Sequence, residues 1–243
     1  MNLLVLTYHY FHKDSPWGIK RGDESFSVDL ESLDYHCRAM AQSGIRLITP
    51  SAIADRAQYR GDPDRQIIVT IDDGHRSMMD AEEIFIKHAV SPILNVIPSL
   101  VGQENYLDWA HLRHLATRGF SIQSHSVSHH DLTRLNDLEL SAELEQSKKI
   151  IEDNIGVPVT MIAAPMGRID DRVTQAALNQ GYQVVMTSFT GINTDIDDLK
   201  FLKRFQVKRN RGSRGWDDYF SPASRVRLVG AAKNMAKKIR SRL

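Results

Sequence analysis

The chain has 243 residues, of which 42% are hydrophobic and 25% are charged, as is usual for a globular protein. This length suits a single large α/β domain. The formal net charge of +1 gives no overall electrostatic bias toward nucleic acid, so no nucleic-acid partner is expected. The single cysteine, Cys37, excludes a disulfide within the chain.

The N-terminal segment lacks the features of a targeting signal. Its apolar run, residues 3–6, is too short for the core of a signal peptide and has no basic residue before it. No apolar run in the sequence approaches the length of a membrane span. A cytoplasmic location is therefore expected, with a reducing environment that fits the one cysteine.

Strand-like and helix-like segments alternate along the chain. Short runs rich in Val, Ile and Thr predict strands at 3–8, 46–49, 66–71, 93–97, 120–124, 159–164 and 183–187. Amphipathic segments predict helices at 29–44, 77–90, 108–119 and 137–156. Such alternation favours a parallel sheet with helices outside it. Seven units without a Gly-rich dinucleotide fingerprint predict an α/β fold, a distorted, TIM-like (β/α) barrel of seven strands. An open doubly wound sheet is the alternative.

The sequence divides into two regions. Residues 1–210 contain the predicted barrel, and residues 211–243 form a basic C-terminal extension. The extension is weakly amphipathic, so it is expected to pack on the barrel as a terminal helix. A contact with an anionic surface, such as a membrane face, is the alternative.

Polar residues follow several of the predicted strands. His9 follows the first strand, Asp72 and Asp73 follow the third, and His125 and His129 follow the fifth. In a parallel barrel these positions share one rim, where active sites are built. Two histidines four residues apart face the same way within a helical turn and can hold one metal, with an aspartate as third ligand. The alternative is a pair of surface or capping histidines.

Three short motifs carry a resemblance to a known family. They are TIDDG at 70–74, HSVSH at 125–129 and AAPMG at 163–167. With the sequence around them, from about residue 3 to residue 209, they resemble the NodB-like polysaccharide deacetylases, carbohydrate esterase family four. The opening LTYHYF, and the absence of any histidine after His130, resemble a permuted subgroup that includes the poly-N-acetylglucosamine deacetylases.

The resemblance implies a metal site and a substrate. Asp73, His125 and His129 would hold a divalent metal, with Zn²⁺ as the default; iron, nickel and cobalt suit the same ligands. The reaction would remove an N-acetyl or other N-acyl group from an amino sugar. The substrate would be an N-acetylated amino sugar in an oligosaccharide or in a lipid-linked glycan, and the C-terminus would make any peripheral membrane contact.

The resemblance also implies the catalytic roles. Asp72 would be the general base and His9 the general acid that protonates the departing amine. The backbone N–H of Met166 would donate to the oxyanion. Substrate contacts would come from residues beside these groups: Pro165, Gly167, His75 and Arg168.

Three positions depart from the family pattern. Ala163 stands where the family often has an arginine that orients the base, and Arg76 or Arg168 could replace that arginine. His75 stands where proline is common and could be a plain loop residue. Met166 replaces an aromatic residue, which suggests a different acceptor sugar.

The sequence also leaves other functions open. A catalytically inactive glycan-binding protein on the same fold is the alternative function. A phosphoesterase or sugar isomerase would need bridging carboxylates or Lys and Glu ligands that do not stand out. Arg204 is expected to pair with a rim carboxylate. Trp216 and Tyr219 are expected to pack against the barrel, with a sugar subsite as the other possibility.

Overall fold

The computed structural model describes residues 2–14, 23–54, 65–194, 196–209 and 216. The predicted basic extension therefore lies outside the described residues, apart from Trp216, and so does Tyr219. Trp216 is buried and its ring stacks on His36 at a centroid distance of 3.7 Å, so it packs against the domain as expected. Among the described residues, no helix is both long and apolar enough to cross a membrane.

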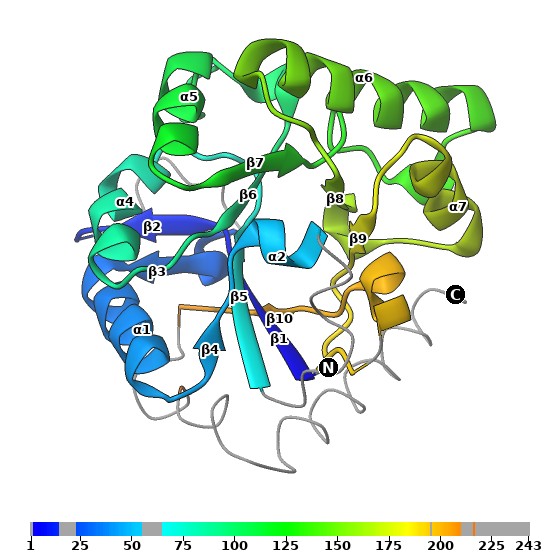
Figure 1. Cartoon of the computed structure of the whole chain (residues 1–243). Coiled ribbons are helices and arrows are strands. Elements are labelled where there is room, and N and C mark those ends of the chain that lie inside the picture. The colour runs from blue at the N-terminus through cyan, green and yellow to red at the C-terminus, as the bar shows by residue number, and fades with distance from the viewer. Residues whose placement is uncertain (1, 15–22, 55–64, 195, 210–215, 217–243) are drawn as a thin grey trace.

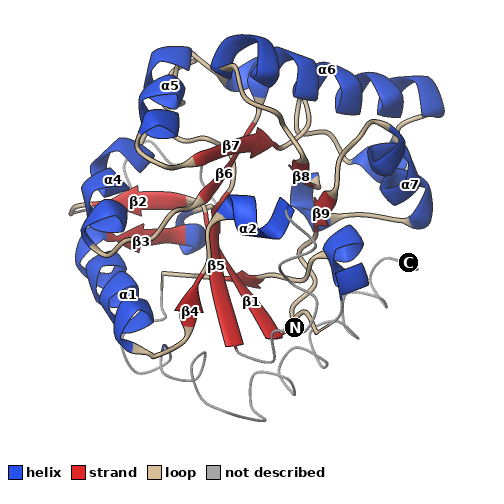
Figure 2. Cartoon of the chain, viewed as in Figure 1, coloured by secondary structure: helices blue, strands red, loops and turns tan. Residues whose placement is uncertain are grey.

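The core of the molecule is a curled parallel sheet with helices around its outside (Figures 1 and 2). The seven strands of its path run in the order β10-β1-β5-β6-β7-β8-β9. A parallel bridge joins Met186 of β9 to Leu202, three residues before β10, so the sheet curls back toward its other end. The fold is thus the distorted (β/α) barrel predicted from the alternation, and the open doubly wound sheet is wrong. In chain order the strands are Asn2–Tyr8 (β1), Arg65–Ile71 (β5), Ile93–Val96 (β6), Ser121–Ser124 (β7), Met161–Ala163 (β8), Val184–Met186 (β9) and Phe205–Gln206 (β10).

The set of seven strands differs from the predicted set at one place. The segment predicted as a strand at 46–49 forms β4 (Arg46–Leu47), which pairs only with the start of β5 and lies off the main path. The seventh strand is instead β10, whose two residues give too short a pattern to be seen in the sequence. A separate small sheet, β2 (Tyr10–His12) and β3 (Ser27–Asp29), was also not predicted.

The predicted helices are all present, and their ends follow from local chemistry. In the longest, Asn136 accepts hydrogen bonds from the first-turn N–H groups, and Gly156 ends the helix in a left-handed conformation. The α-helices are Leu30–Gln42 (α1), Pro50–Ala54 (α2), Met78–Lys87 (α4), Trp109–Thr117 (α5), Asp137–Ile155 (α6) and Asp171–Asn179 (α7). The 3-10 helices are Glu24–Phe26 (η1), Pro98–Leu100 (η2), Leu132–Arg134 (η3), Pro165–Gly167 (η4) and Ile196–Phe201 (η5). Of the α-helices, α2 and α7 were not predicted.

Strand alternation separates two cores. Successive side chains of a strand point to opposite faces, so every second residue enters the barrel. The outward residues pack under the helices in the larger cluster, and the inward residues form a smaller cluster inside the barrel. The inward cluster includes Leu3, Val5, Ile68, Ile93, Met161, Ala163, Val184 and Met186. This inner apolar cluster lies below the polar groups at the rim and packs against them.

Candidate active site

The inward rows of the strands become polar where they reach the carboxyl end of the barrel. On β5 the row continues from Ile68 through Thr70 to Asp72, and Thr7 of β1 meets Thr70 through a 2.9 Å hydroxyl contact. The same alternation brings His125 inward after β7, where Asp72 and His125 are both buried. Alternation along the strands therefore collects the predicted residues at one rim.

Three of the predicted residues converge as metal ligands would. One ligand atom from each of Asp73, His125 and His129 lies within 4.8 Å of the others. The Nε2 atoms of His125 and His129 lie 3.5 and 3.8 Å from the same oxygen, Oδ1 of Asp73. Two imidazole nitrogens and one carboxylate oxygen, with space between them, fit a divalent ion such as zinc.

Neighbouring groups fix the orientation of these ligand atoms. The Tyr10 hydroxyl donates a 2.7 Å hydrogen bond to Oδ2 of Asp73, which leaves Oδ1 facing the histidines. The Nδ1–H of His125 donates to the carbonyl of Ala163 at 2.7 Å, so Nε2 is the nitrogen available to an ion. Such outer partners set the tautomer and direction of metal ligands.

The loop that carries the histidines is not helical, which corrects the sequence argument. Residues 125–129 follow β7 as an irregular loop. Ser126 and His129 both have left-handed backbone, with φ values of 61° and 60°. The two imidazoles meet, with ring centroids 4.8 Å apart, because the loop turns back sharply rather than because they share a helical turn.

Asp72 is held as a buried carboxylate by two partners. Arg204 donates to both of its oxygens, at 2.8 and 2.9 Å, and Asn95 donates to Oδ1 at 2.8 Å. Burial alone would raise the pKa of this carboxyl, but the charge of Arg204, then His125 and His9, hold the pKa well below its usual range. Asp72 is therefore ionised and fixed in orientation.

Arg204 takes the place that sequence reasoning offered to other arginines. Arg168 pairs with Asp131 at 2.6 Å, and Arg76 is exposed, so neither contacts Asp72. The expectation that Arg204 pairs with a rim carboxylate is confirmed, and that carboxylate is Asp72. Arg204 also donates from Nε to the carbonyl of Thr187 at 2.8 Å, which fixes the guanidinium inside the barrel.

His9 lies at the same rim, next to the aromatic residues of the small sheet region. Its ring centroid is 4.9 Å from that of Phe26 and 6.0 Å from that of Tyr10. Burial lowers the pKa of His9, although the carboxylates of Asp73 and Asp72 act in the opposite direction. Its Nδ1 is buried without a hydrogen-bond partner among the described residues.

The Pro165–Gly167 segment forms a tight turn beside β9. Met166 adopts φ 56°, and the residue is 50% exposed. Gly167 has φ 65°, and a Cβ built on it would lie 2.1 Å from the Cβ of Ser188. The turn thus needs glycine at residue 167 for both its backbone angle and its close packing.

Gly167→Ala is expected to destabilise the protein more than a glycine replacement elsewhere. Left-handed backbone costs a residue with a Cβ about 1–2 kcal/mol, and the clash with Ser188 adds to this cost. Gly156→Ala is the matched control, because Gly156 has φ 80° but nothing within 4 Å of its Cβ position. Denaturant unfolding of both variants checks this. Equal losses in the free energy of unfolding would contradict it.

The other predicted substrate contacts take different positions. His75 is buried, with Nδ1 2.9 Å from the hydroxyl of Ser77 and its ring edge-on to Tyr10 at 5.1 Å. Arg168 is about half exposed and is paired with Asp131. Pro165 is buried at the start of the turn. His75 thus packs against Tyr10, whose hydroxyl donates a hydrogen bond to Asp73.

Sequence reasoning missed Tyr10 and Asn95. Tyr10 stands two residues after the end of β1, in the small strand β2 that was not predicted. Asn95 was assigned to a strand but given no role. A polar residue at an inward position of a short apolar strand is the signal that could have identified it, because a buried amide needs a partner.

Comparisons with known proteins establish the family. The sequence profile of the polysaccharide deacetylase family matches residues 59–185, more than half of the chain, so the chain belongs to this family. Its members deacetylate glycans, and the chain is accordingly a hydrolase of the carbohydrate-deacetylase class.

Individual relatives are distant in sequence but similar in fold. The chain is 24% identical over 219 residues to YxkH of Bacillus subtilis (strain 168), provisionally assigned as a polysaccharide deacetylase; the alignment covers 89% of this chain and 75% of YxkH. The structure of the Streptococcus pyogenes deacetylase PplD is 23% identical, with a TM-score of 0.79 over 91% of this chain and 99% of PplD. IcaB from Ammonifex degensii is 18% identical, with a TM-score of 0.72 over 90% and 95%.

Proposed function

We propose that the protein is a metal-dependent hydrolase that removes an N-acetyl group from an amino sugar of a glycan or glycan precursor. One observation carries this proposal. Asp72, held ionised by Arg204, is adjacent in sequence to Asp73, whose Oδ1 faces the Nε2 atoms of His125 and His129. A proton acceptor beside a metal-ligand set is the arrangement that amide hydrolysis by water requires.

The two neighbouring aspartates would divide the work. Asp73, His125 and His129 would hold a divalent ion, zinc by default, which when bound supplies a Lewis acid that activates water and polarises the amide carbonyl. Asp72 would accept the proton of the attacking water. Its contacts with Arg204 and Asn95 keep the carboxylate in one orientation, which favours transfer of the proton at a defined position.

The remaining roles fall to His9 and the turn at Met166. His9 would deliver a proton to the nitrogen of the departing amine, because an amine anion is too basic to leave. The backbone N–H of Met166 would donate to the oxyanion of the transition state. The exposed Met166 side chain would contact the sugar where other family members carry an aromatic ring.

His9→Ala is expected to lower kcat on an N-acetyl sugar by about 10²–10⁴-fold, the usual contribution of a general acid. An aryl acetate has a leaving group that needs no proton, so its hydrolysis is expected to change much less. Rates on both substrates, measured with equal zinc loading, check this. Equal losses on the two substrates would contradict a role for His9 as an acid.

The proposed function is tested by acetate release from N-acetylglucosamine oligomers. Oligomers with β-1,6 and with β-1,4 linkages are incubated with chelator-treated protein and with the same protein reloaded with zinc. The expected result is acetate and free amine from at least one oligomer after reloading only. Oligomer binding without acetate release, even with zinc, would overturn the proposal and favour the glycan-binding protein.

A further inference from the structure

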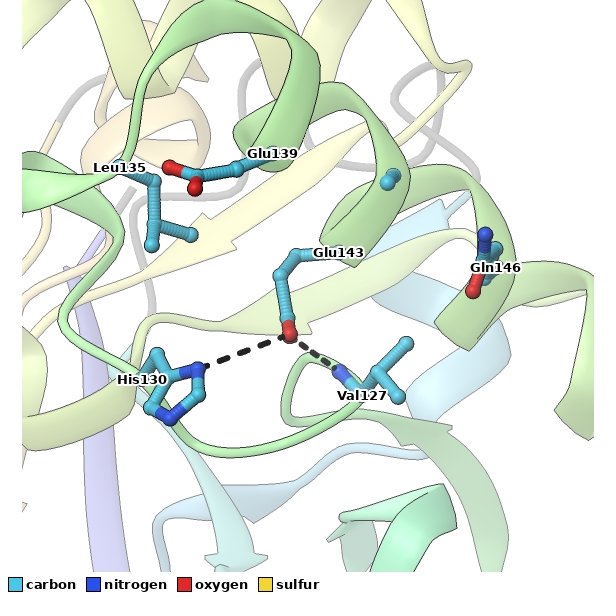
Figure 3. Close-up of a pocket in the computed structure, with 7 residues that line it drawn as sticks. Val127, His130, Leu135, Glu139, Glu143 and Gln146 are labelled. Carbon is cyan, nitrogen blue, oxygen red and sulfur yellow. Dashed lines mark hydrogen bonds and ion pairs between the residues drawn. The ribbon is translucent and has the colours of Figure 1, made fainter.

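We infer that Glu143 of α6 is a positioning residue that holds the loop 125–129 in the conformation that metal binding needs. This inference rests on the proposed metal site. Glu143 lies behind the loop, on the side of α6, and would not itself touch the metal or the sugar. Figure 3 shows its carboxylate pointing from the helix toward Val127 and His130.

The Glu143 carboxylate accepts several hydrogen bonds from the loop. Its Oε2 accepts from the backbone N–H of Val127 at 2.8 Å and from that of Ser128 at 3.0 Å. Its Oε1 accepts from the hydroxyl of Ser128. Hydrogen bonds to an ionised carboxylate are stronger than neutral ones. Glu143 thus grips two successive peptide groups between the two histidines.

The loop needs such a grip because its conformation is costly. Ser126 and His129 are left-handed without being glycine, and such residues persist only where the surroundings determine them. Two other hydrogen bonds of the loop join neutral groups. The Ser126 hydroxyl accepts from the N–H of His129 at 3.1 Å, and the backbone N–H of Ser99 donates to the carbonyl of Val127 at 3.1 Å. Glu143 adds hydrogen bonds to a carboxylate.

Glu143 connects the loop to a helix that is firmly packed on the barrel. Its side chain is only 14% exposed, and its helix is fixed to the barrel through the buried Leu140 and Leu144. A ligand loop tied to a rigid helix keeps its geometry better than a free loop. The helix therefore contributes to where the Nε2 of His129 lies relative to Asp73.

An open pocket of about 330 Å³ adjoins the Glu143 side chain (Figure 3). Because water can enter it, truncating Glu143 would leave a solvated gap rather than a dry cavity in the core. The loop can therefore be loosened without collapse of the fold. The pocket is lined by Val127, His130, Leu135, Glu139, Ala142, Glu143 and Gln146.

Three variants of the full chain separate positioning from other effects. Glu143→Ala removes the grip. Glu143→Gln keeps an oxygen that can accept both N–H groups, and its amide can donate to the Ser128 hydroxyl. Gln146→Ala is the matched control, since Gln146 lines the same pocket from the same helix and is exposed.

The readouts are zinc affinity, by competition with a chromophoric chelator, and the visible absorption bands of bound Co²⁺, which report ligand geometry. Glu143→Ala is expected to weaken zinc binding by about 10–100-fold, as loss of an outer partner does, and to change the Co²⁺ bands. Glu143→Gln keeps an acceptor oxygen but loses the charge, so it is expected to fall between Glu143→Ala and the wild type in both readouts. Gln146→Ala is expected to match the wild type.

Wild-type affinity and bands in Glu143→Ala would overturn the inference while leaving the proposed function intact. A wild type that binds no zinc would instead refute the metal site itself. Circular dichroism checks the fold of each variant. If Glu143→Ala does not fold, Glu143→Asp replaces it, because its shorter side chain keeps the charge but cannot reach the loop. Unchanged zinc affinity in Glu143→Asp would then overturn the inference.

Discussion

Replacing Arg204 with methionine is expected to lower the free energy of unfolding by about 3–5 kcal/mol, the usual cost of breaking a buried ion pair on one side. Arg204 and Asp72 are both buried, and the guanidinium contacts both carboxylate oxygens. Without it, Asp72 keeps only Asn95 as a described side-chain partner and remains a buried charge. Denaturant unfolding of the metal-free protein measures the loss.

The double variant Asp72→Asn with Arg204→Met is the control for this interpretation. It removes both charges, and pairs of buried charges can often be replaced by neutral side chains with little loss. We therefore expect the double variant to be more stable than Arg204→Met alone. If the two variants were equally unstable, packing of the Arg204 side chain rather than its pairing with Asp72 would explain the loss.

Asp72→Asn is expected to lower kcat/KM on an N-acetylglucosamine oligomer by about 10²–10⁴-fold, the usual contribution of a general base. The amide keeps the size of the carboxylate but cannot accept a proton from water. Zinc binding is expected to remain, because the proposed ligands are Asp73, His125 and His129. Acetate release and bound zinc are measured on the same preparation.

Two controls accompany this variant. Asp72→Asn leaves Arg204 without its anionic partner, so the assay temperature must lie well below the unfolding transition of the variant. Asp73→Asn is the matched comparison, since it should lose zinc as well as activity. Retained activity in Asp72→Asn with full zinc loading would refute its role as the base.

The sequence contained most of the information that locates the site. A strand of period two ending in two adjacent aspartates predicts an inward and an outward position, and Asp72 occupies the inward one above Ile68 and Thr70. Asp73 is inward only because its backbone is left-handed, with φ 77°. No periodic pattern encodes that turn, so the convergence of Asp73 with the histidines was predicted from the motifs alone.

The histidine loop brings His125 and His129 together, as predicted, but by a different geometry. A spacing of four residues suggested a helical turn, but the structure joins His125 to His129 through a loop with left-handed residues. Tertiary contacts, including those from Glu143, stabilise that loop. The spacing in the sequence gives the number of residues between the two histidines. It does not give the backbone conformation of those residues.

The sequence predicted that Arg204 pairs with a rim carboxylate, but not that this carboxylate is the proposed base Asp72. Arg204 is 132 positions from Asp72 in the sequence, and the strand that follows it, β10, has only two residues. Its position depends on how the chain closes the barrel between Leu202 and Phe205. Closure of this kind is a property of the assembled sheet, so no local pattern could select Arg204 over Arg76 or Arg168.

The most direct test of the account is the metal content of the purified protein, measured for the wild type beside His129→Ala. The account predicts about one equivalent of zinc or a similar divalent ion in the wild type, as one three-ligand site holds one ion, and its loss in the variant. A wild type that binds no metal after incubation with excess zinc would contradict the metal site and, with it, the proposed hydrolysis.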